Sequence, residues 1–344
     1  MSVPPNFSFL SAVATGQVEP AQTHLVQELK HASPLLGCRL DPTGQYVFAG
    51  AQDNTIQRWH LATGKKTELT GHKSWVRGLT FAAKEKLLFS GDYAGKLLAW
   101  PVEDDTPAAG RAIEAHRGWV RALAVSPDGK TLVTCGNDHL VKLWSIPDCQ
   151  PLAELIGHEN HVYNVAFHPD GHHLVSADLK GIVKVWDLAK GSVERDLDAK
   201  VLHKYDPTFM ADHGGVRSMA ISADGKLLAC AGITNVSNAF AGVGNPLVVL
   251  FDWETGKQKQ QLKPRENFQG TAWGVGFHPT GYIIGVAGGS GGMLYFWKPD
   301  AATDVFALKL PQNARDLDLH PDGRRLAIAC ADGAVRVYDM GPKL

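Results

Sequence analysis

Short apolar segments separated by turn residues recur along the whole chain. The clearest unit starts with Val120–Val125, turns at Ser126–Gly129, continues in a second apolar run and ends at Val141–Trp144. The segments are rich in β-branched and aromatic residues and partly alternate apolar with polar positions, as in Thr55–Trp59, which is typical of strands. No segment keeps an apolar period of about 3.6 residues, so we expect few helices.

Aromatic residues close the third segment of each unit, and they show that the unit occurs seven times. These residues are Trp59, Trp100, Trp144, Trp186, Phe251, Trp297 and Tyr338. Neighbouring ones lie 41 to 46 residues apart, except for the 65 residues between Trp186 and Phe251. Four short strands in about 42 residues are typical of one blade of a β-propeller. We therefore expect an all-β fold, a seven-bladed β-propeller of four-stranded antiparallel blades.

A histidine stands at a fixed distance before the closing aromatic residue. In the first four units it precedes the tryptophan by 28 residues, and in two of them it follows a glycine, as Gly71-His72 and Gly157-His158. The fourth unit ends in a literal Trp-Asp pair, Trp186-Asp187. Over about residues 22–340 the chain therefore resembles the WD40 repeat family, and this resemblance also implies a seven-bladed propeller.

Blade seven needs an outer strand from elsewhere, because its third strand ends at Tyr338, close to the end of the chain. The segment Thr23–Leu29 matches Pro151–Ile156, which is the outer strand expected for blade three. We predict that Thr23–Leu29 completes blade seven, which closes the ring and removes an exposed strand edge. The expected domains are a partly flexible tail over residues 1–21 and a single propeller over residues 22–344.

Charge and cysteine usage narrow the classes of partner. The net charge is −1, so global electrostatics give no reason to expect binding to nucleic acid or to an anionic membrane. The five cysteines form no Cys-x-x-Cys pair, which favours a reducing compartment, and we expect a cytoplasmic protein that is monomeric alone. No apolar run approaches the roughly 18 residues of a membrane helix. Cys149, in a Pro-Asp-Cys turn, is the cysteine that we expect to be exposed.

One blade carries residues that could be taken for a catalytic triad. Blade three contains His116, Thr134, Asp138 and Trp144. The WD40 resemblance implies a structural role instead, a hydrogen-bonded tetrad that keeps buried polar groups satisfied. Other blades hold partial copies: Ala49 stands at the hydroxyl position of blade one, and Asp92 and Asp178 of blades two and four are displaced by two residues. We expect these copies to be incomplete.

The histidines near blade four invite a metal-site interpretation. They are His158, His161, His168, His172 and His173. His158 belongs to the tetrad positions, and His168 sits in a Phe-His-Pro turn whose His-Pro pair recurs at His278 and His320. The others lie at opposite ends of one predicted strand, so we expect no metal site there.

Gly129-Lys130-Thr131 lies in a hairpin turn and lacks the first glycine of a phosphate loop, and we expect no cofactor.

Two positions of each repeat carry partner contacts in relatives of the WD40 family, on the top face around the central channel. Counting back from the turn glycine, or from the histidine in blade two, which lacks that glycine, gives the candidate binding residues Trp75, Arg77, Trp119, Arg121, His161, Tyr163, Arg217, Trp273 and Arg315. Arginine and tryptophan are enriched in binding hot spots, and guanidinium matches carboxylate or phosphate. The alternative is that the arginines pack the channel mouth and pair with Asp316 or Asp318.

Blade five is longer than the others in two places, residues 195–212 and 233–246, and both are connections on the top face. The leading hypothesis is a non-enzymatic scaffold that binds an acidic or phosphorylated peptide or protein loop on this face. A propeller enzyme with a hydrolase or lyase site at the channel mouth is an alternative. A second alternative is binding of single-stranded nucleic acid by stacking on Trp75 and Trp119.

Overall fold

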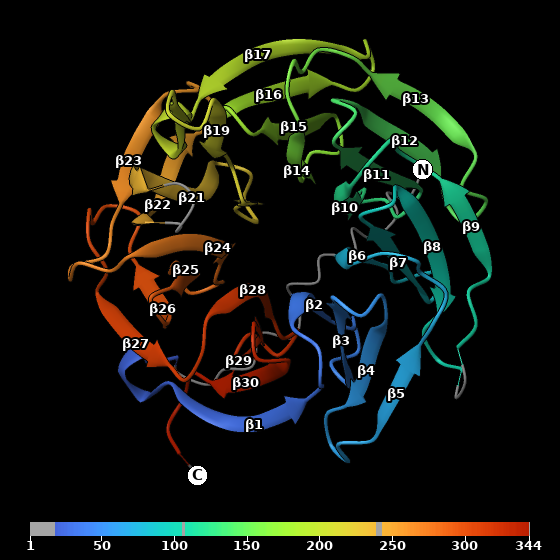
Figure 1. Cartoon of the computed structure of the whole chain (residues 1–344), viewed down its shortest axis with the longest axis horizontal. Coiled ribbons are helices and arrows are strands. Elements are labelled where there is room, and N and C mark those ends of the chain that lie inside the picture. Colours follow the sequence, from blue (N-terminus) through green and yellow to red (C-terminus); the bar gives the residue numbers. More distant parts are fainter. Residues whose placement is uncertain (1–17, 105–106, 239–242, 344) are drawn as a thin grey trace, which may run out of the picture.

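Seven four-stranded antiparallel sheets surround a central channel in the computed structural model, which describes residues 18–104, 107–238 and 243–343 (Figure 1). This confirms the predicted all-β propeller. The described residues contain only two single-turn helices, η1 (Pro20–Gln22) and η2 (Lys200–Leu202). Neither has the length or apolar character that a membrane crossing requires.

Each blade is a meander whose first strand lies next to the channel and whose fourth strand lies at the rim. The strands of blades one to four are β2 (Leu35–Leu40), β3 (Tyr46–Ala51), β4 (Ile56–His60), β5 (Lys66–Leu69); β6 (Val76–Ala82), β7 (Leu87–Asp92), β8 (Lys96–Pro101), β9 (Arg111–Glu114); β10 (Val120–Val125), β11 (Thr131–Gly136), β12 (Val141–Ser145), β13 (Pro151–Leu155); β14 (Val162–Phe167), β15 (His173–Asp178), β16 (Ile182–Asp187) and β17 (Ser192–Asp198).

Blades five and six follow the same order. Their strands are β20 (Ser218–Ile221), β21 (Leu227–Asn238), β22 (Val243–Asp252), β23 (Gln258–Leu262); β24 (Gly270–Phe277), β25 (Ile283–Gly289), β26 (Gly292–Trp297) and β27 (Phe306–Leu310). Blade seven consists of β28 (Ala314–Leu319), β29 (Arg325–Cys330), β30 (Ala334–Asp339) and, from the other end of the chain, β1 (His24–Lys30).

Strand β1 closes the ring, as predicted. It pairs antiparallel with β30 from His24 opposite Asp339 to Lys30 opposite Ala334. Arg336 on β30 is buried and its guanidinium forms ion pairs with Glu28 of β1, at 2.8 Å, and with Asp332, at 2.6 Å. The two ends of the chain therefore share one sheet and one buried charge network.

The apolar core lies between neighbouring blades, because each sheet buries both of its faces. One cluster joins Val175 and Val185 of blade four to Leu228 and Val249 of blade five. The closing tryptophans of blades one, two and four are almost fully buried. Cys149 is buried as well, so the prediction that it is exposed is wrong. Its turn folds back into the core between blades two and three, beside Trp144 and Ile146.

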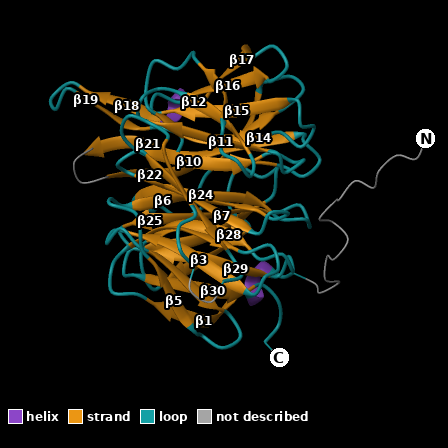
Figure 2. Cartoon of the chain, turned by 90° about the vertical axis from the view of Figure 1, so that its right-hand side faces the viewer, coloured by secondary structure: helices purple, strands orange, loops and turns teal. Residues whose placement is uncertain are grey.

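The two extra segments of blade five are ordered on one face of the ring. Strand β17 continues to Asp198, so the first insertion starts later than residue 195, and it contains a short hairpin of β18 (His203–Asp206) and β19 (Ala211–Gly214). The second is an extension of the β21–β22 hairpin. Both project from the same face (Figure 2, left). We call this the top face; it is formed by the connections between second and third strands and between successive blades.

Candidate functional site

In six of the seven blades a β-bulge aims one side chain of the inner strand at the mouth of the channel. The register of the inner pair shifts between Val120 and Ala122 in blade three, so Arg121 is the extra residue. The same shift in other blades singles out Leu36, Arg77, Tyr163, Trp273 and Arg315. Arg217 directly precedes β20 in blade five. A bulge re-aims the side chain that it carries, and here it brings the sequence-predicted positions together.

Residues of the inner strands of all seven blades line a cavity of about 350 Å³ on the ring axis. Arg77, Arg121 and Arg217 line it directly, together with Tyr163. Arg315 stands beside them with its Cζ atom 5.1 Å from the ring centre of Trp273.

The arginines stack on the aromatic rings. The Cζ atom of Arg121 lies 4.1 Å from the ring centre of Trp119 and 4.4 Å from that of Tyr163. Arg217 lies over Tyr163 at 4.6 Å and over Trp273 at 5.5 Å. These cation–π contacts hold the guanidinium groups in place without neutralising them.

None of Arg77, Arg121, Arg217 and Arg315 forms an ion pair with a carboxylate of the described residues. Burial and, to a smaller extent, the charges of Arg217 and Arg77 lower the pKa of Arg121 to about 10. Burial also lowers the pKa of Arg217, whose Nε–H is buried and has no hydrogen-bond partner. The site is thus a cluster of desolvated cations that repel one another.

Pairing with channel carboxylates is observed for a different arginine, deeper in the channel. Arg39 donates to Asp316 at 2.7 Å. Asp318 accepts a hydrogen bond from the backbone N–H of Leu40, and burial raises the pKa of Asp318 to about 6. The two carboxylates therefore face Arg39. The four arginines at the channel mouth, Arg77, Arg121, Arg217 and Arg315, are left without a carboxylate partner among the described residues.

An aromatic ladder forms the wall of the site beside blades two and three. Tyr93 stacks on Trp119 with ring centres 3.7 Å apart and planes 6° apart, and Trp75 lies 5.9 Å from Tyr93. Trp75 is 43% exposed. Sequence reasoning missed Tyr93, although its place directly after β7, in a connection that belongs to the top face, was a usable signal.

His161 lies near His139, with ring centres 5.5 Å apart, and burial lowers the pKa of His161.

The tetrad of blade three is confirmed as a hydrogen-bonded unit. The imidazole of His116 contacts Asp138 through Nδ1 at 2.8 Å and Thr134 through Nε2 at 2.7 Å. Trp144 donates its indole N–H to the Thr134 hydroxyl at 3.0 Å. Thr134 is fully buried and its hydroxyl contacts both His116 and Trp144, which satisfies these buried polar groups as in a structural unit.

Blades two and four contain complete tetrads, so the prediction that they are incomplete is wrong. His72 contacts Asp92 at 2.9 Å and Ser90 at 2.6 Å, and His158 contacts Asp178 at 3.0 Å and Ser176 at 2.7 Å. In both blades the aspartate stands at the end of the second strand, where its carboxylate reaches back to the histidine. In blade one His31 still contacts Asp53, at 2.5 Å, without a hydroxyl partner.

The other histidines of blade four separate onto two faces. His161 belongs to the top face, as described above. His168 and His173 lie at the opposite end of the blade, and the structure brings a nitrogen of each and a carboxylate oxygen of Asp170 within 4.8 Å of one another. Sequence reasoning treated His168 only as a turn residue and so did not join it with His173.

Comparison with known families identifies the repeats. The model for the WD domain, G-beta repeat, matches residues 23–60, 64–100, 110–145, 149–187 and 308–339. The chain belongs to the WD40 repeat family.

Individual relatives are similar over parts of the chain. An uncharacterized WD repeat-containing protein of Schizosaccharomyces pombe is 27% identical over 143 residues, 39% of this chain and 39% of that protein. The mouse guanine nucleotide-binding protein subunit beta-like protein 1 is 32% identical over 120 residues, 34% of this chain and 36% of that protein. Human apoptotic protease-activating factor 1 is 28% identical over 123 residues, 34% of this chain and 10% of that protein. The matches thus span well under half of these relatives. They support a protein-interaction scaffold.

Proposed function

We propose that this chain is a non-enzymatic scaffold whose top face binds an acidic or phosphorylated peptide segment of a partner protein. The observation that carries the proposal is the cluster of Arg77, Arg121, Arg217 and Arg315, which has no carboxylate partner among the described residues. Uncompensated cations that are partly buried, as these four are, are costly, and an incoming anion offsets both their partial desolvation and their mutual repulsion.

The geometry favours carboxylate or phosphate as the recognised group. Guanidinium binds such groups through two parallel N–H donors. The buried Nε–H of Arg217 supplies a donor that nothing in the described structure uses. Arg121 donates its Nε–H to the side-chain oxygen of Asn137, at 2.7 Å, and this hydrogen bond fixes the orientation of its remaining donors.

The size of the site favours an extended segment over a folded domain. A cavity of about 350 Å³ holds a few side chains. The half-exposed ring of Trp75 lies beside it and offers an apolar surface for a neighbouring residue of the same peptide. We therefore expect the acidic group to enter the channel mouth while an apolar or aromatic residue packs on the ladder of Trp75, Tyr93 and Trp119.

An array of acidic, phosphorylated and neutral peptides tests this proposal. The test variant is Arg77→Glu/Arg121→Glu/Arg217→Glu, and the matched control is Lys130→Glu/Lys190→Glu/Lys226→Glu. The control changes the net charge equally, at exposed turns between first and second or third and fourth strands on the opposite face. We expect wild type and control to bind acidic or phosphorylated peptides and the test variant to lose that binding. Equal binding by all three proteins would refute the proposal.

A further variant guards against misfolding, because Glu places negative charges near the channel. Arg217→Gln removes one guanidinium and keeps a donor, so it should fold and bind acidic peptide at least tenfold more weakly.

Single-stranded oligonucleotides included as competitors test the nucleic-acid alternative. Binding of oligonucleotide in preference to peptide, with a steep salt dependence, would favour that alternative.

A further inference from the structure

The turn between β14 and β15 belongs to a recurrent type that fixes a histidine ring between two blades. His168 donates its Nε2–H to the carbonyl of Gly225 in blade five, at 2.9 Å. His320 donates in the same way to the carbonyl of Gly44 in blade one, at 2.9 Å. Gly225 has φ +73°, and a Cβ there would lie 2.7 Å from His168 Nε2, so the close approach requires glycine. The other ring nitrogen of His168, Nδ1, faces Asp170 of the same turn.

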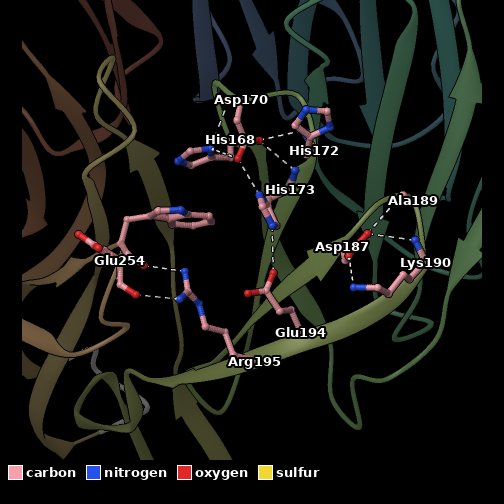
Figure 3. A network of polar contacts seen from close by, with 11 residues as sticks. His168, Asp170, His172, His173, Asp187, Ala189, Lys190, Glu194, Arg195 and Glu254 are labelled. Atoms are coloured by element: carbon pink, nitrogen blue, oxygen red, sulfur yellow. Dashed lines mark hydrogen bonds and ion pairs between the residues drawn. The ribbon is translucent and has the colours of Figure 1, made fainter.

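The second histidine of the turn is oriented by a carboxylate. His173 lies 2.9 Å from Glu194 of β17 through Nε2, and 2.6 Å from Asp170 Oδ2 through Nδ1 (Figure 3). His168 Nδ1 lies 2.9 Å from the same Asp170 Oδ2. Two imidazole nitrogens and one carboxylate oxygen therefore converge on one point.

This convergence is unfavourable for neutral imidazoles without a cation. When both rings give their Nε2–H to Gly225 and Glu194, each Nδ1 carries a lone pair directed at an oxygen that is also an acceptor. His168 Nδ1 additionally accepts the backbone N–H of Asp170, at 3.3 Å. A metal ion bound between these three atoms would remove this repulsion.

Blade seven shows the same turn with a permanent cation. There His320 lies 3.0 Å from Asp322, and Arg325, at the position that corresponds to His173, donates to Asp322 at 2.6 Å. The turn therefore accommodates a positive charge at this position. In blade four the charge-bearing residue is replaced by histidine, which can ligate a metal where arginine cannot.

We propose that His168 Nδ1, His173 Nδ1 and Asp170 Oδ2 bind a divalent transition metal of the zinc class on the face opposite to the top face. Two imidazoles and one carboxylate form a common three-residue ligand set for zinc, with a fourth position open to water. Tetrahedral zinc with ligands at about 2.1 Å separates neighbouring ligand atoms by about 3.4 Å. The ligand atoms, now 2.6 and 2.9 Å apart, therefore need to separate by less than about 1 Å.

The surroundings resemble the outer shell of a metal site. Ligating histidines commonly give their other N–H to a carboxylate or a backbone carbonyl, the roles of Glu194 and Gly225 here. Asp170 Oδ1 accepts the backbone N–H groups of His172 and His173, at 2.8 and 3.1 Å, which orients Oδ2 toward the rings. Trp253 of blade five stacks on His168 with ring centres 4.0 Å apart. The metal would thus be held by blade four alone, at the place where the ring of His168 packs against blade five.

Cobalt and zinc binding by the purified full chain tests the proposal. After treatment with a chelator, wild type at pH 7.5 should bind one equivalent of Co²⁺ with visible absorption of a four- or five-coordinate ion, and Zn²⁺ should displace it. His172→Ala is the matched control, because His172 is exposed and its imidazole lies outside the ligand set. It should bind as wild type does. Absence of saturable one-equivalent binding by wild type, or loss of binding in His172→Ala, would overturn the proposal.

Two variants separate metal binding from folding. His173→Arg reproduces the turn of blade seven, so it should keep the melting temperature of metal-free wild type and lose Co²⁺ binding. Glu194→Gln removes only the outer carboxylate and should weaken metal affinity about 10- to 100-fold. Retained binding in His173→Arg, or unchanged affinity in Glu194→Gln, would contradict the assigned ligands and their orientation.

Discussion

Replacing His116 by alanine tests whether the tetrads stabilise the blades. The imidazole side chain is fully buried, and it connects the Thr134 hydroxyl to the Asp138 carboxylate. Its removal leaves the buried hydroxyl of Thr134 without an acceptor, which costs about 1 kcal/mol. It also removes a charge-assisted hydrogen bond to Asp138, which costs about 2 kcal/mol, although two backbone N–H groups still reach that carboxylate. We therefore expect a loss of about 3 kcal/mol.

Calorimetric melting measures this loss. Unfolding entropy scales with chain length, and for a chain of 344 residues a loss of about 3 kcal/mol corresponds to a fall of about 4 °C in Tm. His172→Ala, at an exposed histidine, serves as the control and should change Tm by less than about 1 °C. A similarly small change in His116→Ala would refute the structural role assigned to the tetrad.

Three further predictions concern ring closure, the channel and the cysteines. Deleting residues 1–30 removes β1 and exposes the edge of β30, so it should cause aggregation or a large fall in Tm; a truncated protein as stable as the full chain would contradict the closure. Burial raises the pKa of Asp318 to about 6, against about 3.9 in the unfolded chain. The folded state therefore binds the proton of Asp318 more tightly than the unfolded state, and Asp318 lowers the free energy of unfolding as pH rises from about 4 to 6. Over that interval Asp318→Asn should therefore gain up to about 3 kcal/mol of unfolding free energy relative to wild type, as measured by urea titrations at several pH values. A difference between the two proteins that does not change with pH would contradict this assignment to Asp318. Burial raises the pKa of the Cys149 thiol, so Cys149 should react with a thiol reagent only after unfolding, and rapid labelling of the native protein would show otherwise.

The repeat pattern was sufficient to predict the fold, because each blade uses the same short strands and turns. The positions at the channel mouth were also predictable, since in blades with a turn glycine the bulge recurs at the same distance before it. Counting residues thus located Arg121 and Tyr163 without knowledge of the bulge.

Features that depend on local backbone geometry could not be counted in this way. Asp92 was judged displaced by two residues, but the end of β7 places its carboxylate 2.9 Å from His72. The group of His168, Asp170 and His173 depends on the turn folding back so that residues five apart face one carboxylate. Tyr93 acquires its role only through stacking with a tryptophan of the next blade. The place of Tyr93 directly after a second strand is visible in the sequence, but the contacts themselves depend on how the backbone folds.

The structure of the chain in complex with the tightest-binding acidic peptide tests the central claim most directly. The account predicts a carboxylate or phosphate of the peptide within hydrogen-bond distance of Arg217 and of Arg77 or Arg121, and peptide chain packed beside Trp75. A peptide bound on the opposite face or along the rim, with the four arginines at the channel mouth unchanged, would contradict it.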